Sequence, residues 1–245
     1  MTTLVVAAHG SRDPRSAANT HAVAEQVRRI RRGLDVQVAF LERSTPNLRD
    51  VLAALSRDVV VAPLLLADAY HARVDIPALI ANSGAQKAAR ADVLGEDRRL
   101  VQVAHQRLAE LGASRLDVEL GVLLVAVGSS REVTNTRTAT VAPMLATGTR
   151  WAGAITAFAT GQSLSLPEAA RHLYRRGAKR LVIVPWFLAH GFFTDRIVRY
   201  ARYHGIPVAE PLGAHPLVAE TLLNRFDEAL DINCLARTDE PVWQT

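Results

Sequence analysis

The chain has 245 residues, which suits one large domain or two of roughly 120 residues each. Hydrophobic residues make up 49% and charged residues 22%, a balance that excludes disordered, collagen-like and coiled-coil proteins. The longest apolar runs, Val59–Ala67 and Leu181–Ala189, fall far short of the roughly 18 residues of a membrane helix, and the single cysteine, Cys234, excludes an internal disulfide. We therefore expect a cytoplasmic protein without a membrane segment.

The formal net charge of +5 raises the alternative of a nucleic-acid-binding protein. Such proteins usually gather their cations in one stripe with interleaved aromatic residues, whereas here the arginines are scattered and aromatic residues amount to 5%. Arginine also pairs with carboxylates through a bidentate fork, so a polycarboxylate small molecule explains the excess equally well. We expect no nucleic-acid partner.

Short apolar segments alternate with helical patterns along the chain. Strands are predicted, in order, at Leu4–Ala8, Val36–Leu41 and Val59–Leu66. A helix capped by Ser16 is predicted between the first two strands, and a helix opened by Pro46 between the next two. Continuous apolar strands separated by helices are typical of parallel strands covered on both sides. The predicted fold class is α/β, with a mostly parallel sheet and helices on both faces.

The sequence also repeats itself. Three dipeptides recur at one offset of 118 residues: Gly10-Ser11 as Gly128-Ser129, Ala39-Phe40 as Ala157-Phe158, and Leu94-Gly95 as Leu212-Gly213. Between the last two, Pro63-Leu-Leu-Leu-Ala matches Pro185-Trp-Phe-Leu-Ala at an offset of 122. A shared offset over so long a stretch indicates two similar α/β domains, at residues 1–115 and 119–235.

This repeat distinguishes residues that the fold needs from residues that a reaction needs. Three polar residues of the first half have apolar or neutral counterparts in the second: His9 corresponds to Val127, Glu42 to Thr160 and His71 to Phe193. Each lies at or just after the carboxyl end of a predicted strand, where ligands bind in open α/β sheets. Imidazole and carboxylate suit Fe²⁺, Co²⁺, Ni²⁺ or Zn²⁺. His9, Glu42 and His71 are therefore the candidate catalytic residues and metal ligands.

Other residues near these strand ends are weaker candidates. Ser11 recurs in the second half, so it is predicted as a turn residue able to hold an anionic group rather than as a hydrolase nucleophile. His190 follows the strand of the second half that corresponds to the one before His71, and His215 follows Leu212-Gly213. Either histidine could face a cleft between the two domains.

Several longer segments carry a resemblance to a known family. They are Val6–Arg15 (Val-Ala-Ala-His-Gly-Ser-Arg-Asp-Pro-Arg), Phe40-Leu41-Glu42 with Pro46, Pro63–Pro77, Val184–Gly191, Asp195-Arg196-Ile197 and Pro211–Pro216. Together they resemble the class II chelatases of tetrapyrrole synthesis, in particular the sirohydrochlorin chelatases in their double-length form. The resemblance extends to about Leu230 and implies two chelatase-like domains, with the metal site in the first.

The resemblance implies a reaction, which is the insertion of a divalent metal ion into sirohydrochlorin without ATP. Fe²⁺, for siroheme synthesis, is the leading metal, and Co²⁺, for cobalamin synthesis, is the alternative. The metal is then a substrate, and no prosthetic group is expected. His9 and His71 would bind the metal and transfer protons, with Glu42 as the less secure third member. A non-catalytic carrier of metal or tetrapyrrole is the alternative from another class.

Sirohydrochlorin is a flat ring with eight carboxylates, and its binding needs both cations and an apolar surface. Arg12, Arg43, Arg73 and Arg196 are the candidates to pair with the carboxylates. Phe193, with Phe192, is expected to form an apolar wall opposite the histidines. Trp186 is expected to pack in the core, with a place in that wall as the alternative. Because both halves are fused in one chain, we expect a monomer.

Overall fold

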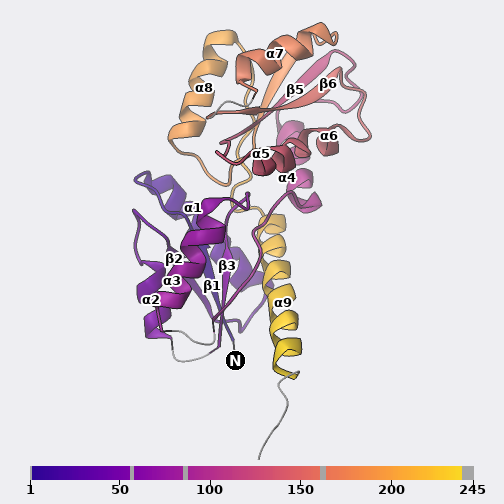
Figure 1. Cartoon of the computed structure of the whole chain (residues 1–245). Helices are drawn as coiled ribbons and strands as arrows, with labels where there is room; N and C mark the ends of the chain where they lie inside the picture. Colours follow the sequence, from indigo (N-terminus) through magenta and orange to yellow (C-terminus); the bar gives the residue numbers. More distant parts are fainter. Residues whose placement is uncertain (1, 56–57, 85–87, 161–163, 239–245) are drawn as a thin grey trace, which may run out of the picture.

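The computed structural model describes residues 2–55, 58–84, 88–160 and 164–238. Two parallel sheets occupy opposite ends of the molecule (Figure 1). The first, ordered β2-β1-β3-β4, consists of β1 (Thr3–Ala8), β2 (Val36–Phe40), β3 (Val59–Pro63) and β4 (Ala88–Arg90). The second, ordered β6-β5-β7, consists of β5 (Leu120–Ala126), β6 (Gly153–Phe158) and β7 (Arg180–Pro185). Every neighbouring pair is parallel, which confirms the α/β prediction.

Helices cover both faces of each sheet. In the first half they are α1 (Pro14–Ile30), α2 (Leu48–Ala54), a π-helical turn at His71–Asp75, α3 (Ile76–Asn82) and α4 (Arg98–Glu110). In the second half they are α5 (Glu132–Ala139), α6 (Val141–Ala146), α7 (Leu166–Arg175), α8 (Phe192–His204) and α9 (Pro216–Thr238). None of these helices is long and apolar enough to cross a membrane, over the residues that the structure describes.

Some predicted boundaries were wrong by a few residues. Asp13, not Ser16, caps α1, because its carboxylate accepts the Arg15 backbone N–H and Pro14 occupies the first helical position. Asn47 caps α2 in the same way, so this helix begins at Leu48 and not at Pro46. The third strand ends at Pro63, earlier than predicted. In each case a polar side chain or a proline near the predicted boundary determines where the element begins or ends.

The two halves are structurally equivalent at the offsets found in the sequence. The Leu64 backbone N–H donates to the Ala7 carbonyl at 2.8 Å, and the Trp186 N–H donates to Val125 at 2.7 Å. The next pair, Leu94 to Leu65 and Leu212 to Phe187, has the same N···O distance of 2.9 Å in both halves. The offset changes from 118 to 122 through an insertion. The loops at the carboxyl ends of the strands nevertheless form the same backbone hydrogen bonds in both halves.

The last helix of each repeat packs on the other half. α9 contacts α1, β3 and β4 and runs beside the first sheet in Figure 1, whereas α4 contacts α6 and β7. Arg107 of α4 donates to the Pro211 carbonyl at 3.1 Å, and its counterpart Arg225 of α9 donates to the Val93 carbonyl at 3.1 Å. One buried apolar cluster consequently includes residues of both halves. The division at residues 115–119 remains a prediction, and the two repeats are joined by this exchange of helices.

Candidate functional site

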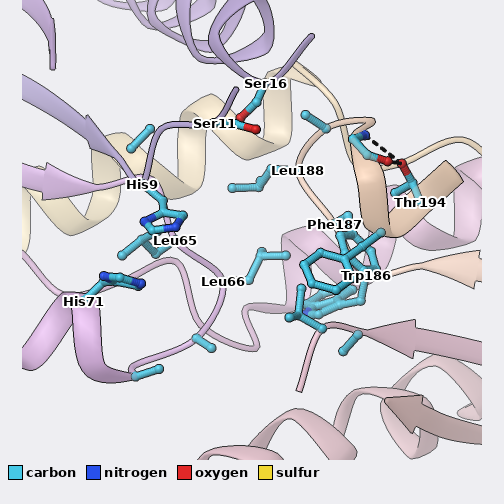
Figure 2. A pocket seen from close by; sticks show the side chains of 18 of the residues that line it. His9, Ser11, Ser16, Leu65, Leu66, His71, Trp186, Phe187, Leu188 and Thr194 are labelled. Carbon is cyan, nitrogen blue, oxygen red and sulfur yellow. Dashed lines mark hydrogen bonds between the residues drawn. The ribbon is translucent and has the colours of Figure 1, made fainter. Parts of the chain in front are cut away.

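A cavity of about 570 Å³ lies between the carboxyl ends of the two sheets. Its lining from the first half includes His9, which follows β1, and His71, which follows β3. The corresponding loops of the second half contribute Val127 and Phe193. Figure 2 shows the two imidazole rings side by side on one wall, with aromatic side chains across the cavity. The site is therefore where open α/β sheets bind ligands, with two such edges facing each other.

The turn after β1 brings the Glu42 loop against His9. Gly10 has a φ of +88°, and the Glu42 backbone N–H donates to the His9 carbonyl at 3.0 Å. A Cβ at position 10 would lie 1.8 Å from the Glu42 carbonyl oxygen, so only glycine permits this approach. Gly128 plays the same part in the second half, where a Cβ would lie 2.6 Å from the Thr160 carbonyl oxygen.

Replacement of Gly10 by alanine should lower the free energy of unfolding by more than about 2 kcal/mol, because backbone strain and a steric clash add together. Gly33→Ala is the matched control, since Gly33 also has a positive φ, of +84°, but an added Cβ there would meet nothing within 4 Å. This control should cost about 1 kcal/mol. Urea unfolding of both variants measures the difference, and equal losses would show that the close approach at Gly10 is unimportant.

The three predicted residues lie together. His9 Nε2 is 3.2 Å from Glu42 Oε1, and the ring centroids of His9 and His71 are 4.1 Å apart with planes inclined by 40°. His71 is held in turn by Asp75, whose Oδ2 lies 2.5 Å from His71 Nδ1. With Nδ1 held by this carboxylate, Nε2 is the nitrogen of His71 left for another partner, an arrangement typical of metal-binding histidines.

Burial and charge favour the neutral form of His9. Burial is the main reason that the pKa of His9 is lowered from 6.5, followed by the neighbouring His71 and Arg43, while Glu42 acts in the opposite direction. Nδ1 of His9 is buried without a hydrogen-bond partner among the described residues. A buried, unsatisfied nitrogen is costly in a native structure and is found where a function requires it. His9 is therefore unprotonated near pH 7 and available as a base or ligand.

The histidines and Glu42 do not form a ready-made metal site. Over the described part of the chain, no three His, Cys, Asp or Glu side chains converge so as to hold a metal ion. His9 instead contacts Glu42 on one side and the His71 ring on the other. The arrangement can hold an ion between two neighbouring side chains, and it leaves the remaining coordination positions to another ligand.

The opposite wall of the cavity is largely apolar. Val127, which corresponds to His9, is 38% exposed. Thr160, which corresponds to Glu42, donates its hydroxyl hydrogen to the Val127 carbonyl and so does not direct it into the cavity. Phe192 and Phe193, expected on this wall, line the cavity, and so does Trp186, expected chiefly in the core. Phe192 is largely exposed, whereas Trp186 is buried. A flat, apolar ligand face can pack here.

The predicted carboxylate-binding residues divide into two groups. Ser11, Arg12 and Arg43 line the cavity. Arg73 does not, because it lies two residues after His71 on the same helical turn, where successive side chains diverge, and it pairs with Asp68. Arg196 lies farther along α8 and is also outside the cavity lining. A role of Arg73 and Arg196 in pairing carboxylates therefore stays a prediction, with both residues outside the lining of this cavity.

The structure also separates the remaining histidines and adds a residue that sequence reasoning missed. His190 lines the cavity, with Nε2 at 2.7 Å from Glu210 Oε2. His215 does not, since its Nδ1 accepts the Leu217 N–H at the start of α9. Asp75, which orients His71, is the missed residue. Its signal is the four-residue spacing from His71, which places both side chains on one side of a helical turn.

Comparison with known proteins agrees with this geometry. The family model CbiX matches the chain twice, over residues 3–111 and 121–229. A sirohydrochlorin cobaltochelatase of Priestia megaterium is 24% identical over 96% of this chain and 83% of its own length. A sirohydrochlorin ferrochelatase of the same organism is 27% identical over 80% of this chain and 77% of its own.

Solved structures share the fold. SirB from Bacillus subtilis with Fe³⁺ has a TM-score of 0.80 at 23% identity, covering 93% of this chain and 95% of that one. CbiX, described as the terminal enzyme for biosynthesis of siroheme in denitrifying bacteria, has a TM-score of 0.71 at 23% identity, covering 93% of this chain and 99% of that one. With two tandem matches to one family model, the chain belongs to the CbiX family of chelatases, in its double-length form.

Proposed function

We propose that this protein inserts a divalent metal ion, in the first place Fe²⁺, into sirohydrochlorin. The observation that carries the proposal is the pair of imidazoles, His9 and His71, on one wall of a cavity whose other wall is largely apolar, with Glu42 against His9 and outside the cavity lining. The named activities of the two relatives from Priestia megaterium support the same reaction class. The metal is a substrate in this proposal, and the chain contributes no prosthetic group.

The reaction exchanges protons for metal. Two pyrrole N–H bonds break as metal–nitrogen bonds form, so two protons must leave the ring while the ion loses its water ligands. The imidazoles of His9 and His71 can replace water on the ion and accept protons, because a nitrogen lone pair serves both roles. The negative charge of Glu42 beside His9 stabilises the imidazolium that forms and attracts the cation.

The substrate is positioned by the two walls together. The apolar wall formed by Phe192 and Phe193 packs against the macrocycle and keeps water from the reacting centre. Arg12 and Arg43 are available for carboxylates of the ring, with Ser11 as a further hydrogen-bond partner. Because one chain supplies both walls, we also infer that it acts as a monomer, which analytical ultracentrifugation at assay concentration tests.

An anaerobic assay tests the proposed function. Purified protein in catalytic amount is mixed with sirohydrochlorin and Fe²⁺, Co²⁺ or Ni²⁺, and the absorbance change is compared with a protein-free control. Many turnovers per protein molecule are expected, with the fastest rate for Fe²⁺. A faster rate with Co²⁺ would assign cobalt insertion instead. A single stoichiometric change indicates a carrier, and no reaction with any metal contradicts the proposal.

Asp75→Asn should lower kcat about tenfold, because loss of the carboxylate that contacts His71 Nδ1 leaves the imidazole ring less well oriented. Asp231→Asn, at an exposed position of α9, removes the same charge far from the cavity and should leave kcat unchanged. Steady-state rates of both variants with Fe²⁺ measure the effect. Normal turnover in Asp75→Asn would mean that Asp75 does not support the reaction through His71.

A further inference from the structure

The two ends of the boundary between the halves carry different charges at equivalent positions. At one end α1 begins beside α8, and at the other α5 begins beside the loop after β3. The starts of α1 and α5 share a hydrogen bond. The Ser11 hydroxyl accepts the Asp13 N–H at 3.0 Å, and the Ser129 hydroxyl accepts the Arg131 N–H at 3.1 Å. On the same offset Arg15 corresponds to Val133, and on the offset of 122 Arg73 corresponds to Asp195.

The first end is closed by an ion pair between the halves, formed by Arg15. Its guanidinium makes two parallel hydrogen bonds to Asp195, at 3.0 and 2.6 Å, and three to Asp13, at 2.6, 3.0 and 3.3 Å. Hydrogen bonding to Arg15 is the main reason that the pKa of both carboxyl groups is lowered. Every charge at the centre of this end is therefore already paired within the protein.

The second end lacks a counterpart of the Arg15–Asp195 pair, because Val133 replaces the arginine and Arg73 replaces the aspartate. Here lies a separate cavity of about 400 Å³, lined by Asp68, Arg73, Asp92, Val93, Gly95, Glu96, Asp97, Arg131, Val133, Thr134, Arg137 and Arg225. Thr134 lines both cavities, and its hydroxyl donates to the Asp68 carbonyl at 3.4 Å. The charged cavity is therefore next to the metal-insertion site, with Thr134 in the wall between them.

The charges of this cavity are only partly matched. Asp68 pairs with Arg73, and Asp97 pairs with Arg99 and Arg225. Arg131 and Arg137 form no ion pair over the described part of the chain. Glu96 accepts the Thr138 hydroxyl at 3.3 Å, and Asp92 is the remaining acidic group. The cavity thus offers two free guanidinium groups, whose planar forks match carboxylates.

We propose that this second cavity binds carboxylate arms of the tetrapyrrole through Arg131 and Arg137. The inference rests on the proposed function and extends it, because the eight carboxylates of sirohydrochlorin extend outward from the ring on all sides. Arms on the edge nearest Thr134 leave the first cavity in the direction of the second. Because the cavity also holds the acidic groups Asp92 and Glu96, a carboxylate arm gains most where it pairs directly with a guanidinium fork.

Binding without metal tests this site separately from turnover. Anaerobic titration with metal-free sirohydrochlorin is followed by quenching of tryptophan fluorescence, for which Trp186 in the first cavity is a reporter. The double variant Arg131→Gln/Arg137→Gln should raise Kd about tenfold through the loss of two charge-assisted contacts. Arg131→Lys/Arg137→Lys should restore part of the loss. The control Arg199→Gln/Arg202→Gln removes the same charge from exposed positions of α8 and should leave Kd unchanged.

The steady-state readouts separate the outcomes. KM for sirohydrochlorin should rise in Arg131→Gln/Arg137→Gln while kcat and KM for Fe²⁺ stay unchanged. An unchanged Kd would overturn the second site and leave the proposed function intact. A higher KM for Fe²⁺ at unchanged Kd for sirohydrochlorin would also overturn it, because the cavity would then serve the metal ion. If the unmodified protein binds no tetrapyrrole, this inference and the proposed function both fail.

Discussion

His9→Ala is expected to lower kcat for metal insertion by about a hundredfold or more, and His71→Ala by a similar factor. Each substitution removes one of the two imidazoles whose rings lie 4.1 Å apart. The remaining ring can neither replace the lost ligand nor take both protons. Because the two rings act as a unit, the double variant should be little slower than either single variant. Anaerobic steady-state rates at saturating sirohydrochlorin and Fe²⁺ measure these effects.

The second half of the chain provides the control for folding. Val127 and Phe193 take the positions of His9 and His71 within the same backbone, so neither imidazole is needed by the fold. The two alanine variants should therefore retain their circular dichroism and cooperative unfolding. Val127→Ala, which truncates the equivalent side chain across the cavity, should keep kcat within a few fold. Near-normal turnover in His9→Ala or His71→Ala would contradict the assignment of the site.

The strands, and the correspondence between the two repeats, could be predicted because each depends on short sequence segments that can be recognised one at a time. Each strand is a continuous apolar run, and the repeated glycines fix the same turn twice, as the positive φ of Gly10 and Gly128 shows. Residues that follow the carboxyl ends of parallel strands meet at one edge of the sheet. The proximity of His9, Glu42 and His71 could therefore be predicted from the sequence.

The exchange of helices could not be predicted in this way. The buried side chains of α4 show that this helix has an apolar face, but an apolar pattern does not say which sheet the face covers. The answer depends on contacts such as Arg107 with the Pro211 carbonyl, which join residues far apart in the sequence. The direction of the Arg73 side chain could not be predicted for a related reason, since it depends on the helical turn that begins at His71.

The pH dependence of the reaction is expected to follow His9. Because its pKa is lowered from 6.5, His9 becomes protonated only as the pH falls below that value. Protonation removes the lone pair that binds metal or accepts a proton, so kcat should be constant near pH 7. It should then fall about tenfold for each further pH unit on the acid side. A loss of activity centred above pH 6.5 would contradict the assigned shift.

Two neighbouring charges should move this acid limb in opposite directions. Arg43 lowers the pKa of His9, so Arg43→Gln should move the limb to higher pH, whereas Glu42 raises the pKa, so Glu42→Gln should move it to lower pH. Only the midpoints are compared, since Glu42→Gln also loses a group proposed to act on the metal. Unfolding temperatures over the same pH range separate titration from denaturation. If the two midpoints move in opposite directions, the charges of Arg43 and Glu42 act through the protonation of His9. If both midpoints move in the same direction, the substitutions have changed the fold instead.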